Sequence, residues 1–316
     1  MIWPGATDTS TAPPHASPWR HSLPPSLAAC GRAVLLQPDA TSKISLTHAA
    51  FDAFTSGGLP VGEDSAPDAP ARPALPRLVP LREVPRQPQT QLSLAAFQMH
   101  LLAHIELNAV DLAWDTVVRY SHLPMPRKFF ADFVRVADDE ARHLGWCLQR
   151  LHELGTFYGA VDSHNALWEA AEATADDVLD RLVIVPCVQE ARGLDAGPRL
   201  IERLKGAGDA RSAAIVQRIS SEEQAHVAVG VAWLHAVASS RGVDPGDAFS
   251  SAVRRHIPDG LRGPFDLHTR ERVGLPRHWW ESSTEARIND QDARKLASRL
   301  QTLVAADVAM AGRRVS

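Results

Sequence analysis

Two Glu-x-x-His motifs occur in this chain of 316 residues, and each is preceded by a lone glutamate. The first set is Glu106, Glu140 and His143, and the second set is Glu190, Glu223 and His226. The lone glutamate precedes the motif glutamate by 34 residues in the first set and by 33 residues in the second. Four carboxylates and two imidazoles in this order are the ligand set of a di-iron or di-manganese centre in a four-helix bundle.

The geometry of helices accounts for this spacing. Residues three apart lie on one face of an α-helix, so the Glu and His of each motif can bind one ion. Glu106 and Glu140 lie about 18 and 16 residues from the proline-containing break between them. Glu190 and Glu223 each lie about 16 residues from a Gly-containing turn at 206–208. Each pair of helices therefore brings its two glutamates to a similar height in the bundle.

The surroundings of the motifs also favour a metal site. Glu106 and Glu190 lie in apolar helical segments, where unpartnered carboxylates would be costly to bury and would repel one another. A cluster of cations compensates for both effects. Oxygen ligands with two imidazoles suit iron or manganese better than a thiolate-seeking metal. We therefore expect two Fe ions, with Mn as the alternative, whereas a single such motif would more often be a solvated helix face.

Several polar residues near the motifs are candidates for supporting roles. Asp139 and Glu222 each directly precede a motif glutamate and are expected to orient a ligand histidine through its other ring nitrogen. Exposed helix charges are the alternative for both. His104 lies on a different helix face from the ligands and is expected to be a core histidine rather than a seventh ligand. Arg192 and Asp195 are expected to be structural, with a place at the site entrance as the alternative.

Tyrosines and a basic, aromatic set of residues are further candidates for chemistry. Tyr120 is about 21 Å along the helix from Glu106, too far to store a radical beside the metals. Tyr158 could store such a radical only if it folded back over the site. A basic and aromatic set could form an RNA-binding surface, although scattered surface arginines are the favoured interpretation. This set comprises Arg254, Arg255, His256, Arg270, Arg272, Arg277, Trp279 and Trp280.

Composition restricts the class of protein. Hydrophobic residues make up 45% of the chain, enough for a sizeable core, and the net charge of −4 gives no general attraction to nucleic acid. The three cysteines have no ligand-like spacing and indicate a reducing compartment without a disulfide framework. No apolar run is long enough for a membrane span, and the N-terminus lacks the features of a signal peptide. A cytoplasmic location is the default expectation.

An all-α fold is expected, with extensions on both sides of a central bundle. Residues 1–26 are rich in Pro, Ser and Thr and are expected to be disordered. Residues 27–90 should form short helices at 27–36 and 45–54, followed by a Pro-rich arm laid over the bundle. A free linker is the alternative for the arm. Residues 242–316 should form a helical extension, with helices at 245–256 and 283–311.

The four-helix bundle is expected over residues 91–241. Its first two helices should span 93–121 and 126–155, and a long connection with a short helix at 166–172 should cross the bundle. Thr174 is expected to cap the third helix, Pro186 to kink it, and Gly193 to end it. A short helix at 196–205 and a helix at 210–241 capped by Asp209 are expected to follow.

These residues together resemble the DUF455 family of ferritin-like proteins. The resemblance extends from Asp39 to Trp280 and is most specific over residues 104–230. The stretches that carry it are His104–Asp111, Asp139–His143, Tyr158–Gly159, Ser163–His164, Leu167–Glu169, Gln189–Asp195, and Glu223–Val227 with Gly230. Glu222 stands where the family pattern would have Asp. The resemblance implies a ferritin-like bundle with its metal site and, by wider analogy with a tRNA-hydroxylating di-iron family, oxygenase chemistry.

Three functions remain open from the sequence. The first is an oxidase or hydroxylase that activates O₂ and acts on a small molecule, with RNA as the alternative substrate. An electron-donor protein and a second copy of the chain, in a homodimer, are its expected partners. The second is a ferroxidase or iron-handling protein, and the third is a bundle that metals only stabilise. No phosphate-binding loop or nucleophile elbow supports nucleotide binding or serine hydrolysis.

Overall fold

A computed structural model of the chain describes residues 23–281, and the expected helix at 283–311 and most of the segment 1–26 lie outside this range. The described residues are helical and contain no strand, apart from an isolated bridge between Leu78 and Ser163. The predicted all-α fold class is therefore confirmed. None of the helices within 23–281 combines the length and hydropathy that crossing a membrane requires.

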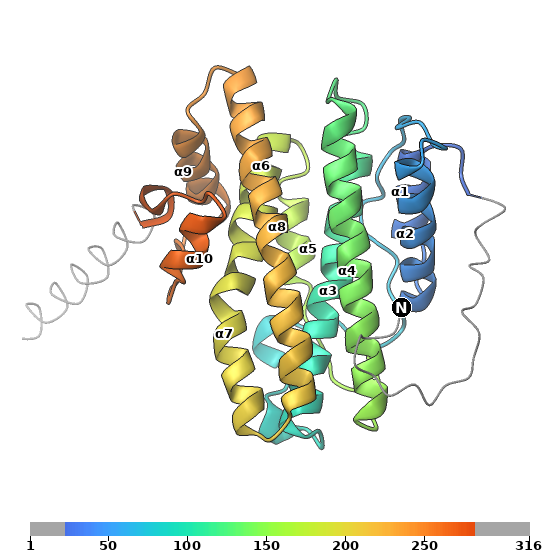
Figure 1. Cartoon of the computed structure of the whole chain (residues 1–316), viewed down its shortest axis with the longest axis vertical. Helices are drawn as coiled ribbons and strands as arrows, with labels where there is room; N and C mark the ends of the chain where they lie inside the picture. Colours follow the sequence, from blue (N-terminus) through green and yellow to red (C-terminus); the bar gives the residue numbers. More distant parts are fainter. Residues whose placement is uncertain (1–22, 282–316) are drawn as a thin grey trace, which may run out of the picture.

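Four long helical segments form the centre of the molecule (Figure 1). They are α3 (Leu94–Arg119), α4 (Arg127–Glu153), a composite segment, and α8 (Ala210–Ser240). The composite segment comprises α6 (Val178–Leu182), the π-helical η4 (Val183–Glu190) and α7 (Ala191–Gly206). Helix α3 packs along α4, and α4, η4 and α7 each pack against α8. The first, second and fourth of the expected bundle helices thus form within a few residues of their predicted ends.

A long connection sets the direction of the third segment. The chain leaves α4 at its C-terminal end, passes through the short helix α5 (Ala166–Glu172), and reaches α6 beside the C-terminal end of α3. The Tyr120 hydroxyl at that end donates a hydrogen bond to the Thr174 carbonyl over 2.9 Å. Because α4 and α6 therefore start at the same end of the bundle, the connection crosses its full length.

Side chains at the helix starts explain most of the boundaries. The Ser93 hydroxyl accepts from Ala96 N over 3.2 Å, and the Asp209 carboxylate accepts from Ser212 N over 2.8 Å. The predicted Thr174 cap is wrong, because Asp177 caps α6 by accepting from Leu179 N. The Thr174 hydroxyl instead donates to the Ala171 carbonyl at the end of α5.

The third segment bends through a π-helix rather than breaking. Pro186 has no N–H to donate and its ring crowds the preceding turn, and the wider π-helical turn of η4 accommodates both effects. The predicted end at Gly193 is wrong, since α7 continues through it to Gly206. Gly230 of α8 faces this bend, and a Cβ there would lie 2.3 Å from Pro186 Cβ. Close packing of α8 on η4 therefore requires glycine at this position.

We expect Gly230→Ala to lower the free energy of unfolding by about 1–3 kcal/mol, because the added methyl group forces η4 and α8 apart. Urea unfolding followed by circular dichroism measures this loss. Gly193→Ala is the matched control, because a Cβ at Gly193 would meet no atom within 4 Å. Equal stability of the Gly230→Ala variant and the parent would contradict the requirement for close packing.

Outer elements cover two opposite sides of the bundle (Figure 1). Helix α1 (Leu27–Leu35) packs on α3, and α2 (Ala40–Thr55) packs on α4 and begins five residues before its predicted start. Helices α9 (Pro245–His256) and α10 (Leu267–Arg272) lie on the opposite side, against the third segment.

The Pro-rich arm lies along the bundle, as predicted, and is not a free linker. It contains the short helices η2 (Leu81–Glu83) and η3 (Gln87–Gln89). Its backbone bonds to α1 through Leu27 N and Ala71 N, and to the long connection through Val79 N. These contacts attach the arm to α1 and to the long connection over residues 60–79.

Two apolar clusters fill the bundle interior. One comprises the C-terminal half of α3, the N-terminal half of α4, η4 and the C-terminal half of α8. The other comprises the opposite halves of α3, α4 and α8 with the end of α7. The motif glutamates and histidines lie in the layer between the two clusters, so apolar side chains pack above and below them.

Candidate metal centre

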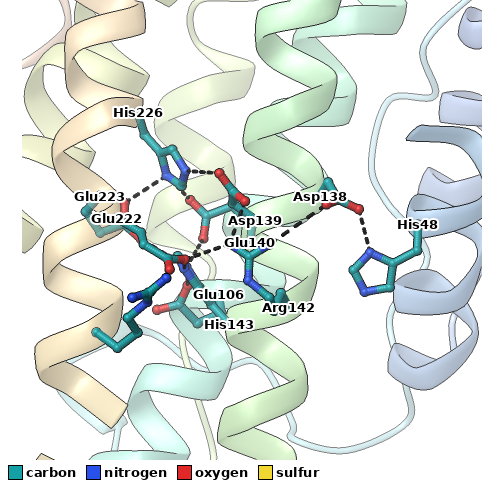
Figure 2. A network of polar contacts seen from close by, with 11 residues as sticks. His48, Glu106, Asp138, Asp139, Glu140, Arg142, His143, Glu222, Glu223 and His226 are labelled. Atoms are coloured by element: carbon teal, nitrogen blue, oxygen red, sulfur yellow. Dashed lines mark hydrogen bonds and ion pairs between the residues drawn. The ribbon is translucent and has the colours of Figure 1, made fainter. Parts of the chain in front are cut away.

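All four bundle segments contribute side chains to one polar cluster in this layer, and Figure 2 shows those from α3, α4 and α8. Helix α3 contributes Glu106, α4 contributes Glu140 and His143, and η4 ends at Glu190. Helix α8 contributes Glu223 and His226. Their ligand atoms form two groups, each spanning no more than 4.8 Å. The first group is Glu106, Glu140, His143 and Glu223, and the second is Glu190, Glu223 and His226.

The two imidazoles face the same pair of glutamates. His143 Nδ1 lies 3.3 Å from Glu140 Oε2 and 3.3 Å from Glu223 Oε1. His226 Nδ1 lies 3.0 Å from Glu140 Oε1 and 3.1 Å from Glu223 Oε2. Glu106 Oε2 completes the first group at 3.5 Å from His143 Nδ1. Glu140 and Glu223 therefore lie between the two groups, in position to be shared.

The outer nitrogens of the imidazoles meet two further carboxylates in a crossed arrangement. His143 of α4 has its Nε2 2.9 Å from Glu222 Oε2 of α8. His226 of α8 has its Nε2 3.3 Å from Asp139 Oδ2 of α4. The structure thus places Asp139 and Glu222 where the sequence analysis expected them, each beside the histidine of the opposite motif. A carboxylate at this position fixes the ring orientation and increases the basicity of a ligand histidine.

Burial and mutual repulsion perturb the protonation of the cluster. Burial raises the pKa of Glu106 well above its ordinary value, and the Glu140 charge adds to this rise. Burial also raises the pKa of Glu190 to about 8. Burial opposes ionisation of Glu140, but the charges and hydrogen bonds of His226 and His143 outweigh it and lower its pKa. The surrounding carboxylates hold the pKa of both imidazoles well above the ordinary value despite their burial.

These protonation states fit a cation-binding site. Protons must otherwise neutralise the clustered carboxylates, and a metal ion takes their place as the ligands bind. Among the described residues, the buried Glu190 Oε2 has no hydrogen-bond partner, so it is free to act as a ligand. The donor set is carboxylate oxygen and imidazole nitrogen, which suits a hard or borderline divalent ion. The cluster could therefore hold a metal ion, and all six residues predicted as ligands lie in it.

His104 belongs to a separate polar face of α3. Its Nδ1 lies 2.8 Å from the Tyr158 hydroxyl and its Nε2 lies 2.8 Å from the His164 carbonyl. Because a carbonyl only accepts, Nε2 carries the proton and Nδ1 accepts from Tyr158. His104 thus joins the long connection to α3 and lies outside both ligand groups.

His100, one turn before His104, accepts from Gly159 N over 3.0 Å. Burial lowers the pKa of both His100 and His104 to about 4. An unfolded histidine titrates near 6.5, so their stabilising effect is fully present above that pH and is lost as the pH falls towards 4. As the pH falls from 7 to 5, we expect the lost contribution of each histidine to lower the free energy of unfolding by about 1–2 kcal/mol.

Urea unfolding at both pH values measures this decrease. His100→Asn keeps a hydrogen-bond acceptor but does not titrate, so its stability should fall less than that of the parent. An equal decrease in both proteins would show that His100 does not stay neutral in the fold.

Neither Arg192 nor Asp195 is among the groups of described residues that could hold a metal ion. Arg192 is exposed on α7. Asp195 is buried and accepts from Arg270 of α10, with Nε at 2.9 Å and Nη2 at 2.6 Å. The predicted structural role of Asp195 thus involves a partner 75 residues away rather than Arg192.

The basic and aromatic set considered as an RNA-binding surface has its tryptophans buried in the fold. Trp279 and Trp280 are buried, and so is the Arg270 side chain, which pairs with Asp195. Arg255 pairs with Asp180 of α6, and His256 Nε2 lies 2.7 Å from the same carboxylate. These side chains attach the C-terminal helices to the bundle.

The two tyrosines occupy different places. Tyr120 lies at the far end of α3, where it lines a surface cavity of about 730 Å³ with Arg119 and Arg241. Tyr158 folds back onto α3, and its hydroxyl bonds to His104 rather than to a motif glutamate.

Sequence reasoning missed Arg142, which lies between the Glu and His of the first motif. Its Nη2 is 2.6 Å from Asp139 Oδ1 and 2.7 Å from Glu222 Oε2 (Figure 2). Nearby, His48 of α2 lies 2.5 Å from Asp138 of α4. The signal for Arg142 was its position inside the Asp-Glu-Ala-Arg-His motif, where a cation next to two acids can form ion pairs.

A buried ion-pair network was also missed. Asp111 of α3 is fully buried, with Lys43 Nζ of α2 at 2.5 Å from one oxygen and Arg72 Nη1 of the arm at 2.9 Å from the other. Lys43 also donates to the Val34 carbonyl over 3.0 Å. These contacts join α1, α2, the arm and α3 at one point.

Comparisons with other proteins cover the region of the cluster. A protein-family profile described as "Protein of unknown function (DUF455)" matches residues 36–281. A protein of Haemophilus influenzae described as "Uncharacterized protein" is 34% identical over 213 residues, which are 66% of this chain and 74% of the relative. No solved structure matches the chain. The matched range of the family includes every residue of the cluster.

Proposed function

The chain belongs to the DUF455 family, and because the description of that family assigns no activity, we propose a function from the cluster itself. We propose that the protein is a ferritin-like di-iron oxidoreductase that activates O₂ and oxidises an organic substrate. The observation that carries this proposal is the shared position of Glu140 and Glu223. Each of them contacts both imidazoles, as carboxylates that bridge two ions would.

The described side chains would have different roles in such a centre. Glu106 and His143 would complete the ligands of one ion, and Glu190 and His226 those of the other. A bound pair of irons supplies the electrons that reduce O₂ and the oxidising power for the substrate. The two apolar clusters exclude water on either side of the ligand layer.

The outer elements favour an oxidase over an iron-storage protein. A storage shell needs exposed bundle faces for self-assembly, but α1, α2, α9 and α10 cover faces of this bundle. Ferroxidase activity without a shell is the second candidate, and a bundle stabilised by metal without catalysis is the third. Manganese suits the same donors and is the alternative to iron.

Anaerobic loading with Fe(II), followed by metal counting and mixing with O₂, tests the proposal. We expect about two irons per chain and rapid O₂ consumption that stops after one turnover unless a reductant is supplied. A ferroxidase would instead continue to consume O₂ as long as excess Fe(II) is added. Two bound irons that do not react with O₂ would leave only the metal-stabilised bundle.

A further inference from the structure

One guanidinium joins the two outer carboxylates of the cluster. The same nitrogen of Arg142, Nη2, lies 2.6 Å from Asp139 Oδ1 and 2.7 Å from Glu222 Oε2. Asp139 is on α4 and Glu222 is on α8, so this contact also spans the two helices (Figure 2). Asp138 Oδ2 lies 3.9 Å from the other terminal nitrogen. The Trp146 ring lies under the guanidinium, with its centroid 5.5 Å away.

The two carboxylates determine which ring nitrogen is available to a metal. Glu222 contacts Nε2 of His143 and Asp139 contacts Nε2 of His226. A carboxylate accepts hydrogen bonds but does not donate them, so each keeps a proton on Nε2. Nδ1, which faces the inner glutamates, is then the nitrogen that could bind a metal ion once it gives up its proton. If either carboxylate turned away, its histidine could rotate or change tautomer.

We propose that Arg142 is a positioning residue for both metal positions. It holds Asp139 and Glu222 against the two imidazoles, and the crossed arrangement makes one side chain control both halves of the site. This inference rests on the proposed di-metal centre but does not depend on its reactivity with O₂.

No neighbouring cation duplicates this geometry within the described residues. Arg218 also contacts Glu222, but through the other carboxylate oxygen, and its side chain is 62% exposed compared with 18% for Arg142. Lysine could not replace Arg142 well, since a single ammonium on a flexible stem lacks the planar fork of a guanidinium.

Arg150 provides a matched control on the same helix. It is buried to a similar degree, with a side chain 13% exposed, and its Nη2 lies 3.0 Å from the Asp209 carboxylate of α8. It therefore also links α4 to α8. It lies two turns further along α4, about 12 Å from Arg142, and contacts none of the cluster residues. Loss of Arg150 should affect only the packing of the two helices.

The experiment compares the parent protein with Arg142→Gln, Arg142→Lys and Arg150→Gln. Anaerobic calorimetric titration with Co(II) and with Fe(II) gives the stoichiometry and affinity of each binding step. Urea unfolding in the presence of a chelator gives stability without metal. We expect Arg142→Gln to weaken both binding steps by about 10- to 100-fold, the range found for other residues that support metal ligands. Arg142→Lys should restore only part of the affinity, and Arg150→Gln should bind metal like the parent.

The outcomes distinguish failure of the proposed role of Arg142 from failure of the proposed function. Parent-like metal affinity in Arg142→Gln, with a loss of stability equal to that of Arg150→Gln, would reduce Arg142 to a helix-linking residue. Equal weakening of metal binding in Arg150→Gln would also overturn the inference. Two bound ions in the parent without O₂ consumption would reject the oxidase and leave the role of Arg142 intact. A parent protein that binds neither metal would overturn both.

Discussion

Replacing Glu140 by alanine is expected to abolish binding at both metal positions, not only at one. Its two oxygens lie 3.3 Å from His143 Nδ1 and 3.0 Å from His226 Nδ1, so this one carboxylate faces the histidines of both ligand groups. The side chain is buried, and a water molecule entering the cavity would not replace its charge. We expect fewer than about 0.2 irons per chain and no O₂ consumption above background, measured by metal analysis and an oxygen electrode.

Two further variants test whether the effect is specific to Glu140. Glu153→Ala removes a glutamate from the end of the same helix and should retain the metal content of the parent. Glu190→Gln removes one carboxylate ligand from the second group, which has three members compared with four in the first, and should leave one ion bound. If Glu140→Ala kept one ion with parent-like affinity, Glu140 would be a terminal ligand and not a shared one.

Asp111→Ala is expected to lower the free energy of unfolding by about 3–5 kcal/mol, because it leaves the ammonium of Lys43 buried without its carboxylate. Lys43 and Asp111 are both fully buried, and Arg72 loses the same partner. Burial lowers the pKa of Lys43, an effect that the Asp111 charge opposes, so the variant should favour the neutral amine. Urea unfolding measures the loss, which is large for a domain whose total stability is about 5–15 kcal/mol.

A double variant separates lost pairing from lost packing. Lys43→Met combined with Asp111→Leu replaces the pair with apolar side chains of similar size, and should recover most of the stability. A double-mutant cycle with the two single variants gives the coupling free energy. A coupling close to zero would mean that the pair does not stabilise the junction of α2 with α3, and that Asp111→Ala acts through Arg72 and the arm.

Local patterns explain why much of the fold was predictable. The cap at Asp209, the short helix at 166–172 and the bundle helices depend on residues within a few positions of one another. The third segment was predicted less well because its structure does not follow the local preference of its residues. Pro186 and Gly193 are both local helix-breaking signals, but packing of Pro186 against Gly230 stabilises a continuous segment that local preference alone does not.

Contacts between distant residues explain the other differences. The pairing of Asp195 with Arg270 joins residues 75 positions apart, and that of Lys43 with Asp111 joins residues 68 positions apart. Neither pair has a periodic signature, since each depends on how outer helices dock onto the bundle. Individual charged residues in a sequence do not identify their partners when many alternatives are present.

The sequence by itself determined the ligand types and their heights in the bundle. Four glutamates and two histidines come into one layer because of a spacing of three on a helix and two hairpins of matched length. This does not depend on how the neighbouring helices pack. Only the tertiary structure decided which side chains are shared and which support the others. The crossing of Asp139 to His226 and of Glu222 to His143, and the position of Arg142 between them, depend on the rotation of α4 and α8 about their axes. That rotation is set by the packing of apolar side chains across the whole bundle, which the sequence of either motif does not contain.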